Sequence, residues 1–585
     1  MVIGVLLLSS LLLNLNVRVN TVIVHTKNGA LNGTVSTIDR GRNIYKFLGV
    51  PYAEPPVGER RFKEPQPLIS KWEGVRSAQK NSPSCIQYNY YSKFGTAHTH
   101  GNEDCLYMNI YTTSISNSSN LDVVVYMHGG GFMFGSGSAY TPDFILDKYD
   151  VVFITVNYRL GPFGFLSTED EVISGNNGLK DQVQSLVWIQ ENIDHFGGDK
   201  NKVTITGLSA GGASVHLHYL SPLSRNLFHL GISVSGSAFC PWVFAENARM
   251  KAYMLADSVQ CPTNDSKSLL ECLRQKPAES ILLHLENLFM PWYFNPFSPF
   301  GVVVEKENSG AFLSKHPYEY LSEGDVKDAP WLTSITSEEG LYPAASFITN
   351  NDLLHDLNQH WNEIAPHLLD YNYTVPTDEL VDVSQRIKKY YLGNHSIDSD
   401  NKGELVRMMS DRLFVVDIDR AARLQAAATK SPVYFYYFTY RGKYSISSWF
   451  CTCNDNLGVS HADDLLYLLK IGLAPMETDE DKEMVNVMTD IWMSFIQSGV
   501  PSAGPEVPWT PVSPTDKHLT YLMISSAENI TVTSSENLGH REFWDSLPFD
   551  DLKLFEKSGC RNLEMGFQIF LAYLFLLLLL QFNRL

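Results

Sequence analysis

The chain has 585 residues, of which 44% are hydrophobic and 19% are charged, enough to form a large apolar core. Its formal net charge is −19, and the chain contains no cluster of Lys and Arg residues. This composition excludes a nucleic-acid-binding surface. No linker rich in Pro, Gly or Ser divides the chain, so we expect one large domain between two terminal segments.

The chain opens with an apolar segment, VIGVLLLSSLLL, of signal-peptide length and too short to cross a bilayer comfortably. It predicts a signal peptide over residues 1–21, with cleavage between Leu13 and Val22. Sequons that follow such a segment predict a glycoprotein of the secretory pathway. Six Asn-x-Ser/Thr sequons are present, at Asn32, Asn117, Asn264, Asn372, Asn394 and Asn529.

Eight cysteines also fit an oxidising compartment. Cys85 and Cys105 bracket a polar, aromatic loop, and Cys261 and Cys272 bracket a shorter one. The apolar surroundings of Cys240 are typical of a buried thiol. The sequence assigns no partner to the three others, Cys451, Cys453 and Cys560.

In chain order, residues 21–65 predict short strands and turns, and the prolines and glycine of Phe47–Pro56 predict irregular structure there. Continuous apolar, β-branched stretches at Asp122–Met127 and Val151–Tyr158 predict central strands covered on both faces. Recurring apolar residues predict a helix over Leu179–Ile193, which the glycines after Phe196 end.

A further buried strand is predicted at Val203–Thr206, followed by others at Leu230–Val234, Trp331–Ile335 and Val433–Tyr440. The acidic residues of Glu477–Asp481 indicate the solvent-exposed start of a helix. Apolar strands that alternate with amphipathic helices predict an α/β fold with a largely parallel sheet covered on both faces.

The sequence Gly207–Gly211, GLSAG, matches a G-x-S-x-G pattern between a predicted strand and a predicted helix. This context favours a nucleophile elbow, in which the glycines allow a sharp turn that exposes the Ser209 Oγ atom. The alternative is an ordinary loop rich in Gly and Ser, because the bare pattern occurs in many unrelated chains.

A nucleophilic serine also needs donors for the oxyanion that forms in its reaction. The sequence His128–Phe132, HGGGF, directly follows a predicted core strand, and its backbone N–H groups are unobstructed. We expect the oxyanion donors to be the N–H groups of Gly130, Gly131 and Ala210. A flexible glycine turn is the alternative.

The general base must come from 17 histidines. His461 lies in a polar loop after the last predicted strand, where the α/β-hydrolase plan places its base. His216 and His218 are nearer to Ser209, but two residues apart on a helix they face different ways. From these considerations alone His461 is the best of several candidates.

The carboxylate that orients the base should lie between serine and histidine in chain order. Glu338-Glu339-Gly340 follows the predicted strand Trp331–Ile335, although such a sequence is usually a solvent-exposed loop. Ser209, Glu339 and His461 follow the chain order of serine, acid and histidine that the α/β-hydrolase fold uses.

With these residues in place, the chain resembles the type-B carboxylesterases of the cholinesterase/carboxylesterase family, and among them those of insects, over roughly residues 22–550. Several long motifs in the same order make the resemblance specific. They are FLGVPYAEPP (Phe47–Pro56), EDCLYMNIY (Glu103–Tyr111), HGGGF (His128–Phe132), NYRLGPFGFL (Asn157–Leu166), GNNGLKDQ (Gly175–Gln182), FGGD (Phe196–Asp199), GLSAGGAS (Gly207–Ser214), SEEG (Ser337–Gly340) and GVSHADDL (Gly458–Leu465).

The resemblance implies an α/β-hydrolase domain over residues 22–552, with Glu339 as the triad acid and His461 as the base. It implies disulfides Cys85–Cys105 and Cys261–Cys272. It also implies an aromatic-lined gorge, for which Trp292–Phe294 and Phe297–Phe300 are candidate wall residues.

Two departures from the cholinesterases argue against acetylcholine as substrate. Leu208 stands where they carry a glutamate, and no Trp lies between Cys85 and Cys105. A quaternary ammonium would lose a carboxylate and a cation–π partner. The third long-range disulfide of the family also has no evident cysteine upstream of His461.

We therefore expect a serine hydrolase that cleaves small carboxylic esters through an acyl-Ser209 intermediate, without a metal or organic cofactor. An enzyme of juvenile-hormone-esterase type is a narrower alternative. A catalytically silent cell-surface adhesion relative is the alternative from another class, and the intact Ser209, Glu339 and His461 set argues against it.

The C-terminal residues 553–585 contain a second apolar stretch, Phe567–Leu580, too short to span a bilayer comfortably. The small residues Ser558-Gly559-Cys560 and a short polar spacer precede it, which resembles a GPI-attachment signal. We expect an extracellular protein held at the cell surface, with a short transmembrane tail or a buried terminal helix as alternatives.

Overall fold

The computed structural model describes residues 21–558 apart from 39, 70, 89–97, 286–287, 289–291, 293–296, 298 and 473–475. The predicted signal peptide, Cys560 and the apolar C-terminal stretch therefore lie outside the described residues, as do Tyr293 and Phe294 of the predicted gorge wall. Within the described part of the chain, no helix is long and apolar enough to cross a membrane.

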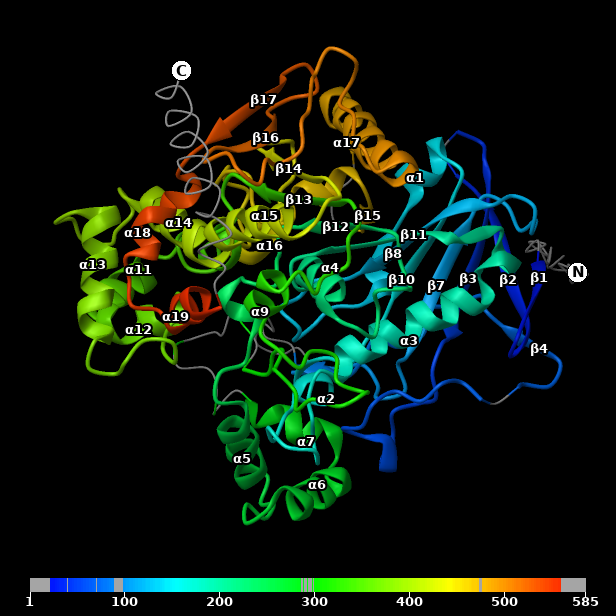
Figure 1. Ribbon diagram of the computed structural model, residues 1–585, viewed down its shortest axis with the longest axis horizontal. Coiled ribbons are helices and arrows are strands. Elements are labelled where there is room, and N and C mark those ends of the chain that lie inside the picture. Colours follow the sequence, from blue (N-terminus) through cyan, green and yellow to red (C-terminus); the bar gives the residue numbers. More distant parts are fainter. Residues whose placement is uncertain are drawn as a thin grey trace, which may run out of the picture.

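A single large sheet runs through the molecule, and its centre is parallel (Figure 1). Its seven central strands pair in parallel in the order β10 (Val151–Val156), β8 (Leu121–Met127), β11 (Gly198–Leu208), β12 (Leu230–Val234), β13 (Trp331–Thr336), β14 (Val433–Phe438) and β16 (Leu519–Ile524).

Antiparallel strands extend both edges of this parallel centre. Next to β10 lie β7 (Tyr107–Thr112), β3 (Asn43–Pro51), β2 (Gly29–Thr37) and β1 (Thr21–Thr26), each antiparallel to its neighbour. The short strand β4 (Val75–Ser77) pairs in parallel with β2. At the opposite edge β17 (Ile530–Ser535) pairs with β16. The sheet is thus mostly parallel, as the alternation of strands and helices predicted.

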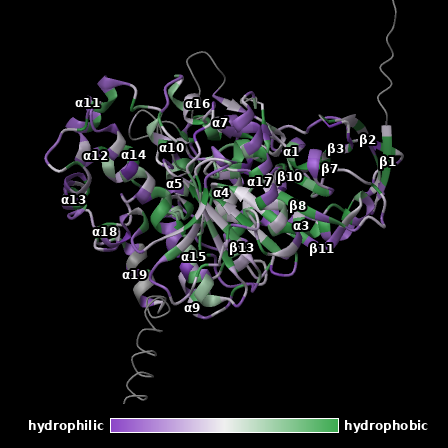
Figure 2. Cartoon of the chain, turned by 90° about the horizontal axis from the view of Figure 1, so that it is seen from above, coloured by the Kyte–Doolittle hydropathy of each residue, from purple (hydrophilic) through white to green (hydrophobic). Residues whose placement is uncertain are grey.

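Helices cover both faces of the sheet, which explains why central strands such as β10 and β13 are buried along their whole length. Val123 and Val125 of β8 join one core cluster, with residues of α3 (Asn177–Asn192), α4 (Ala210–Leu220) and α15 (Val416–Ala428). Val124 and Tyr126 join the other, with residues of α1 (Asp143–Lys148) and α17 (Asp479–Ser498). Figure 1 shows β8 and β10 between α1 and α3, and Figure 2 shows the same strands from above.

Further helices form two groups beside this layered centre (Figure 1). One comprises α5 (Ala248–Ser258), α6 (Ser266–Gln275) and α7 (Ala278–Leu283). The other comprises α11 (Asn351–Gln359), α12 (Trp361–Leu368), α13 (Leu380–Leu392), α14 (Lys402–Ser410), α18 (Arg541–Asp545) and α19 (Asp550–Lys557). The other α-helices of the described residues are α2 (Gly161–Phe165), α9 (Pro317–Ser322), α10 (Leu341–Ala344) and α16 (Ser447–Cys451).

The prediction of irregular structure over Phe47–Pro56 is wrong for its first half, because β3 continues to Pro51. The pairing of β3 with β7 shifts register between Phe47 and Val50, and Gly49 has φ +67°. Glycine adopts that conformation without a steric penalty, so the strand passes through an irregularity and continues.

Three disulfides join described cysteines: Cys85–Cys105, Cys261–Cys272 and Cys451–Cys453. The first two are those that the family resemblance implied. The third, within a C-x-C sequence, had not been assigned. Cys240 is a buried free thiol, as its apolar surroundings predicted.

Candidate active site

Ser209 stands at the junction of β11 and α4 with φ 58° and ψ −122°, a conformation that a non-glycine residue rarely adopts. Its backbone N–H donates to the Val234 carbonyl (2.8 Å), and its carbonyl accepts from the Ala213 N–H (2.8 Å). The turn is therefore anchored on one side to β12 and on the other to the first turn of α4.

The glycines around Ser209 are needed because neighbouring backbone lies too close for a Cβ atom. A Cβ at Gly207 would lie 2.4 Å from the Gly211 carbonyl carbon, and one at Gly211 would lie 2.0 Å from the Met127 carbonyl oxygen. A Cβ at Gly236 would lie 2.1 Å from the carbonyl oxygen of Ser209 itself. The strand–turn–helix geometry is that of the predicted elbow.

The glycine loop after β8 lies directly against this elbow. A Cβ at Gly129 would lie 2.7 Å from the Leu208 carbonyl oxygen and 3.0 Å from the Ser209 Cβ atom. Gly130 and Gly131 have φ +113° and +57°, which favour glycine. Ala210 begins α4, so its N–H belongs to the first turn, which has no intrahelical acceptor.

The carbonyl groups of this loop are held by surrounding donors. The Tyr158 hydroxyl donates to the His128 carbonyl (2.7 Å), and the backbone N–H groups of Met133 and Phe134 both bond the Gly130 carbonyl. The Nδ1 atom of His128 lies 2.8 Å from the Gly129 carbonyl oxygen. Because a trans peptide is planar, holding that oxygen also fixes the direction of the Gly130 N–H.

His128 remains a neutral donor at physiological pH. Burial lowers the pKa of its imidazole to about 4, while its bond to Gly129 acts in the opposite direction. A carbonyl accepts only, so the Nδ1 atom must carry the proton. This tautomer therefore fixes the glycine loop without adding a charge beside it.

Glu339 and His461 form a buried pair. The Glu339 Oε2 atom lies 2.5 Å from the His461 Nδ1 atom, and the two side chains are 0% and 7% exposed. The other carboxylate oxygen accepts from the Thr336 N–H (2.8 Å) and the Ser235 hydroxyl (2.5 Å). With both oxygens occupied, the carboxylate can hold the imidazole in one orientation.

One short segment after β12 connects this pair to the elbow. Val234 accepts the backbone N–H of Ser209, and the next residue, Ser235, donates its hydroxyl to Glu339. Sequence analysis did not identify Ser235. Its position as a polar residue at the carboxyl end of a buried parallel strand was the available signal.

Four aromatic rings form, together with the His461 imidazole, a closed circuit of ring contacts. The His461 ring centroid lies 4.6 Å from that of Phe414 and 5.6 Å from that of Tyr342. Trp242 completes the circuit through Phe414 (5.8 Å) and Phe297 (6.2 Å), and Phe297 returns to Tyr342 (6.2 Å). The imidazole of the base is therefore packed against aromatic side chains.

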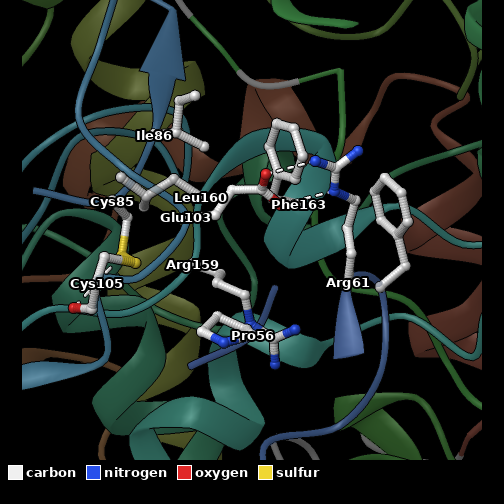
Figure 3. Close-up of a pocket in the computed structure, with 10 residues that line it drawn as sticks. Pro56, Arg61, Cys85, Ile86, Glu103, Cys105, Arg159, Leu160 and Phe163 are labelled. Atoms are coloured by element: carbon white, nitrogen blue, oxygen red, sulfur yellow. Dashed lines mark hydrogen bonds and ion pairs between the residues drawn. A yellow bond between two sulfur atoms is a disulfide. The ribbon is translucent and has the colours of Figure 1, made fainter. Parts of the chain in front are cut away.

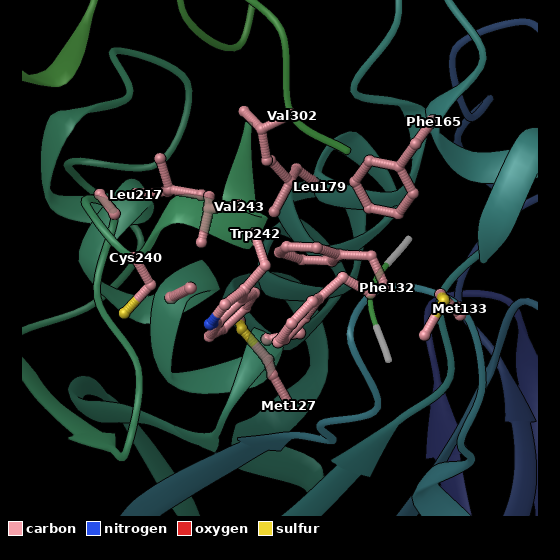
Figure 4. Packing of buried hydrophobic residues seen from close by; sticks show 14 of the residues in the cluster. Met127, Phe132, Met133, Phe165, Leu179, Leu217, Cys240, Trp242, Val243 and Val302 are labelled. Atoms are coloured by element: carbon pink, nitrogen blue, oxygen red, sulfur yellow. The ribbon is translucent and has the colours of Figure 1, made fainter. Parts of the chain in front are cut away.

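Of the predicted wall residues, Phe297 thus lies in the circuit, whereas Trp292 packs on Phe347 and donates to Asp356. No sequence pattern indicated Phe414, which lies in a π-helical turn, Asp411–Val415. Trp242 belongs to the same buried cluster as Met127 and Phe132 (Figure 4).

The first disulfide loop is fastened beside a small cavity of about 10 Å³, enough for at most one water. The Arg61 guanidinium pairs with the Glu103 carboxylate there, and Cys85–Cys105 forms part of the lining (Figure 3). This cavity is too small to hold an ester and is therefore not the substrate site.

His216 and His218, the two histidines near Ser209 in the sequence, are buried and make structural contacts. His216 accepts the Ala238 N–H (3.1 Å) and stacks on Trp331, and the His218 Nε2 atom contacts the Gln182 side chain (3.0 Å). Burial lowers the pKa of each to about 3. No group of three or more potential metal ligands occurs among the described residues.

Known proteins share both the sequence and the architecture of this chain. Residues 20–544 match the model of the "Carboxylesterase family". The chain is 43% identical to venom carboxylesterase-6 of Apis mellifera over 91% of this chain and 95% of that protein. It is 43% identical to esterase FE4 of Myzus persicae, over 84% and 87% of the two chains.

Juvenile hormone esterases are also similar. That of Tribolium castaneum is 37% identical over 83% of this chain and 85% of that protein. The crystal structure of the Manduca sexta enzyme, with OTFP covalently attached, superposes with a TM-score of 0.77 at 26% identity, covering 92% of this chain and 99% of that one.

Proposed function

Since the chain belongs to the carboxylesterase family and is a carboxylic ester hydrolase, we propose that Ser209 is its nucleophile, His461 its base and Glu339 the acid that orients the base. The observation that carries this assignment is the 2.5 Å contact between Glu339 and His461, linked through Ser235 to the elbow that holds Ser209.

In the first half of the reaction His461 removes the proton of the Ser209 hydroxyl, which attacks the ester carbonyl carbon. The oxyanion of the tetrahedral intermediate is bound by the N–H groups of Gly130, Gly131 and Ala210. His461 then protonates the leaving alcohol, and the acyl group remains on Ser209.

In the second half His461 removes a proton from water, which attacks the acyl-Ser209 ester. A second tetrahedral intermediate collapses, the carboxylic acid leaves, and His461 returns the proton to Ser209. Glu339 stays ionised throughout and stabilises the imidazolium that forms in each half. Every proton that is transferred in this scheme comes from a protein group or from water.

Small neutral esters suit this site better than cationic ones. Leu208 precedes the nucleophile and is 6% exposed, so no carboxylate stands there to pair with an ammonium group. The similarity to juvenile hormone esterases makes juvenile hormone the second candidate substrate. Comparing kcat/KM for short aryl esters, juvenile hormone and choline esters distinguishes the three.

Replacement of the nucleophile tests the assignment directly. We expect wild-type protein to hydrolyse short-chain aryl esters and to be labelled stoichiometrically at Ser209 by an organophosphate. Ser209→Ala should lose the label and at least about 10³-fold in kcat, since the oxyanion donors alone give little turnover.

Peptide mass spectrometry locates the label, and the melting temperature provides the folding control. A folded Ser209→Ala protein with undiminished turnover would contradict the role of Ser209. A label on another residue would do the same.

We also propose that the protein is extracellular, anchored through residues 553–585 and glycosylated at its sequons. Three disulfides support an oxidising compartment. Asn117, Asn264, Asn394 and Asn529 are exposed, whereas Asn32 lies within β2 with its side-chain oxygen buried. Asn32 should therefore carry the least glycan.

Treatment of expressing cells with a GPI-specific phospholipase tests the anchor. Release of active esterase supports a lipid anchor. Retention after treatment, with release on truncation at Gly559, supports a transmembrane tail instead.

A further inference from the structure

The two glutamates of Glu338-Glu339 perform different tasks, although they are adjacent. Glu339 contacts the imidazole of His461, whereas the Glu338 side chain turns to the loop that carries it. The Glu338 Oε2 atom accepts from the Val459 backbone N–H (2.7 Å) and from the Ser337 hydroxyl (2.6 Å). The Glu339 carboxylate thus contacts the imidazole of the base, and the Glu338 carboxylate accepts a hydrogen bond from the loop that carries the base.

The backbone strengthens this connection. The Glu338 N–H donates to the Val459 carbonyl (3.0 Å), and Glu338 and Ser460 form a parallel β-bridge. Gly458 has φ +122°, and a Cβ there would lie 2.8 Å from the Glu338 carboxylate oxygen. Only a glycine lets the carboxylate approach the loop this closely.

A second carboxylate holds the same loop from its other end. The Asp463 Oδ2 atom accepts the Ser460 N–H (2.8 Å), and its Oδ1 atom accepts the N–H of Ile446 (2.7 Å), just before α16. The two residues that precede His461 therefore each give their backbone N–H to a different acidic side chain.

We propose that Glu338 is a positioning residue for the base, which fixes His461 against Glu339 by tying the loop of residues 458–460 to the turn that carries the acid. This inference rests on the proposed function, in which His461 is the base. A displacement of a catalytic group by about 1 Å can cost on the order of 10²-fold in rate, so control of this loop has a direct effect on turnover.

Loss of the carboxylate has a specific consequence for the base. Without it the Val459 N–H loses its acceptor, the loop is less constrained, and the contact between Glu339 and His461 lengthens. A more distant carboxylate stabilises the imidazolium that forms in each half of the reaction less well, which lowers kcat.

Kinetics of three variants test the proposal. Glu338→Ala should lower kcat per organophosphate-labelled active site about 10- to 100-fold, with KM changed less than about twofold. Glu338→Gln keeps an acceptor oxygen for the Val459 N–H and should restore kcat to at least about a third of the wild-type value. Ser337→Ala removes only the second donor and serves as the matched control.

The outcomes separate this proposal from the assignment of the base. If Glu338→Ala lowers only the melting temperature or the fraction of protein that can be labelled, with kcat per labelled active site unchanged, Glu338 is structural and the proposal is overturned. If Glu338→Gln is as impaired as Glu338→Ala, hydrogen-bond acceptance is not its role. If His461→Ala remains active, the proposed base itself is wrong.

Discussion

Two buried carboxyl groups, Asp463 and Asp464, follow His461 by two and three residues. Burial raises the pKa of each to about 7, although both accept hydrogen bonds that act in the opposite direction. Asp463 bonds two backbone N–H groups, whereas Asp464 accepts from the Tyr436 hydroxyl (2.9 Å) and leaves its Oδ1 atom without a partner among the described residues.

Because its pKa is raised in the folded state, Asp464 lowers the free energy of unfolding by an amount that depends on pH. In the unfolded chain an aspartate titrates near 4, so between about pH 4 and pH 7 the folded state binds a proton that the unfolded state has released. The free energy of unfolding therefore falls as pH rises through this window and is level above it. Stability from this group is greatest at acid pH.

Asp464→Asn should remove that dependence. Relative to wild type, we expect the variant to gain stability between pH 5 and pH 8 by up to about 3 kcal/mol, since one pKa unit corresponds to about 1.4 kcal/mol. Melting temperatures measured at both pH values check this. Asp479→Asn, at an exposed aspartate, is the control, and an equal gain there would contradict the explanation.

At the scale of elements, the nucleophile elbow depends on contact between α4 and the end of β8. A Cβ at Gly211 would lie 2.0 Å from the Met127 carbonyl oxygen and 2.8 Å from its carbonyl carbon. Neither atom is at the flexible end of a side chain. A substitution must therefore separate the helix from the strand.

Gly211→Ala should consequently destabilise the protein by several kcal/mol, about 3 or more, or prevent its accumulation. A Cβ at Gly403, in the first turn of α14, would meet no neighbouring atom within 4 Å, so Gly403→Ala is the matched control. It should be neutral or gain up to about 1 kcal/mol. Thermal unfolding compares the two, and equal stability of both variants would refute the packing argument.

The individual strands and helices also show how much of the structure could be predicted from the sequence. Strong local patterns predicted the central strands, α3 and the elbow correctly, because burial on both faces and glycine spacing are visible in short segments. Phe47–Pro51 was mispredicted since Gly49 accommodates an irregularity inside a strand. Phe414 could not be found, because its contact with His461 depends on a π-helical turn distant in sequence.

For the molecule as a whole, buried ion pairs join segments that are distant in the chain. Lys180 of α3 lies 2.6 Å from both Glu305 and Glu64, and the Lys180 and Glu305 side chains are 4% and 0% exposed. The other Glu305 oxygen accepts from the Asn176 amide and the Phe312 N–H, both at 2.8 Å. Three regions of the chain thus meet at one cation.

Lys180→Met should leave the Glu305 carboxylate buried without its cation and cost about 3–5 kcal/mol of unfolding free energy. Lys482→Met breaks an exposed pair with Asp479 and should change stability by less than about 0.5 kcal/mol. Denaturant unfolding measures both. A small effect at Lys180 would mean that water enters and compensates the charge.

The arrangement of the proposed catalytic groups at the ends of β8, β11 and β13 and beyond β14 also bears on biosynthesis. Ser209 leaves the ribosome well before Glu339 and His461, and its strained turn is supported by β12 and the end of β8. A nascent chain would hold a serine with neither base nor acid until β13 and β14 dock. Esterase activity would then appear only after β13 and β14 have docked, so the nascent chain would be inert toward esters until late in its synthesis.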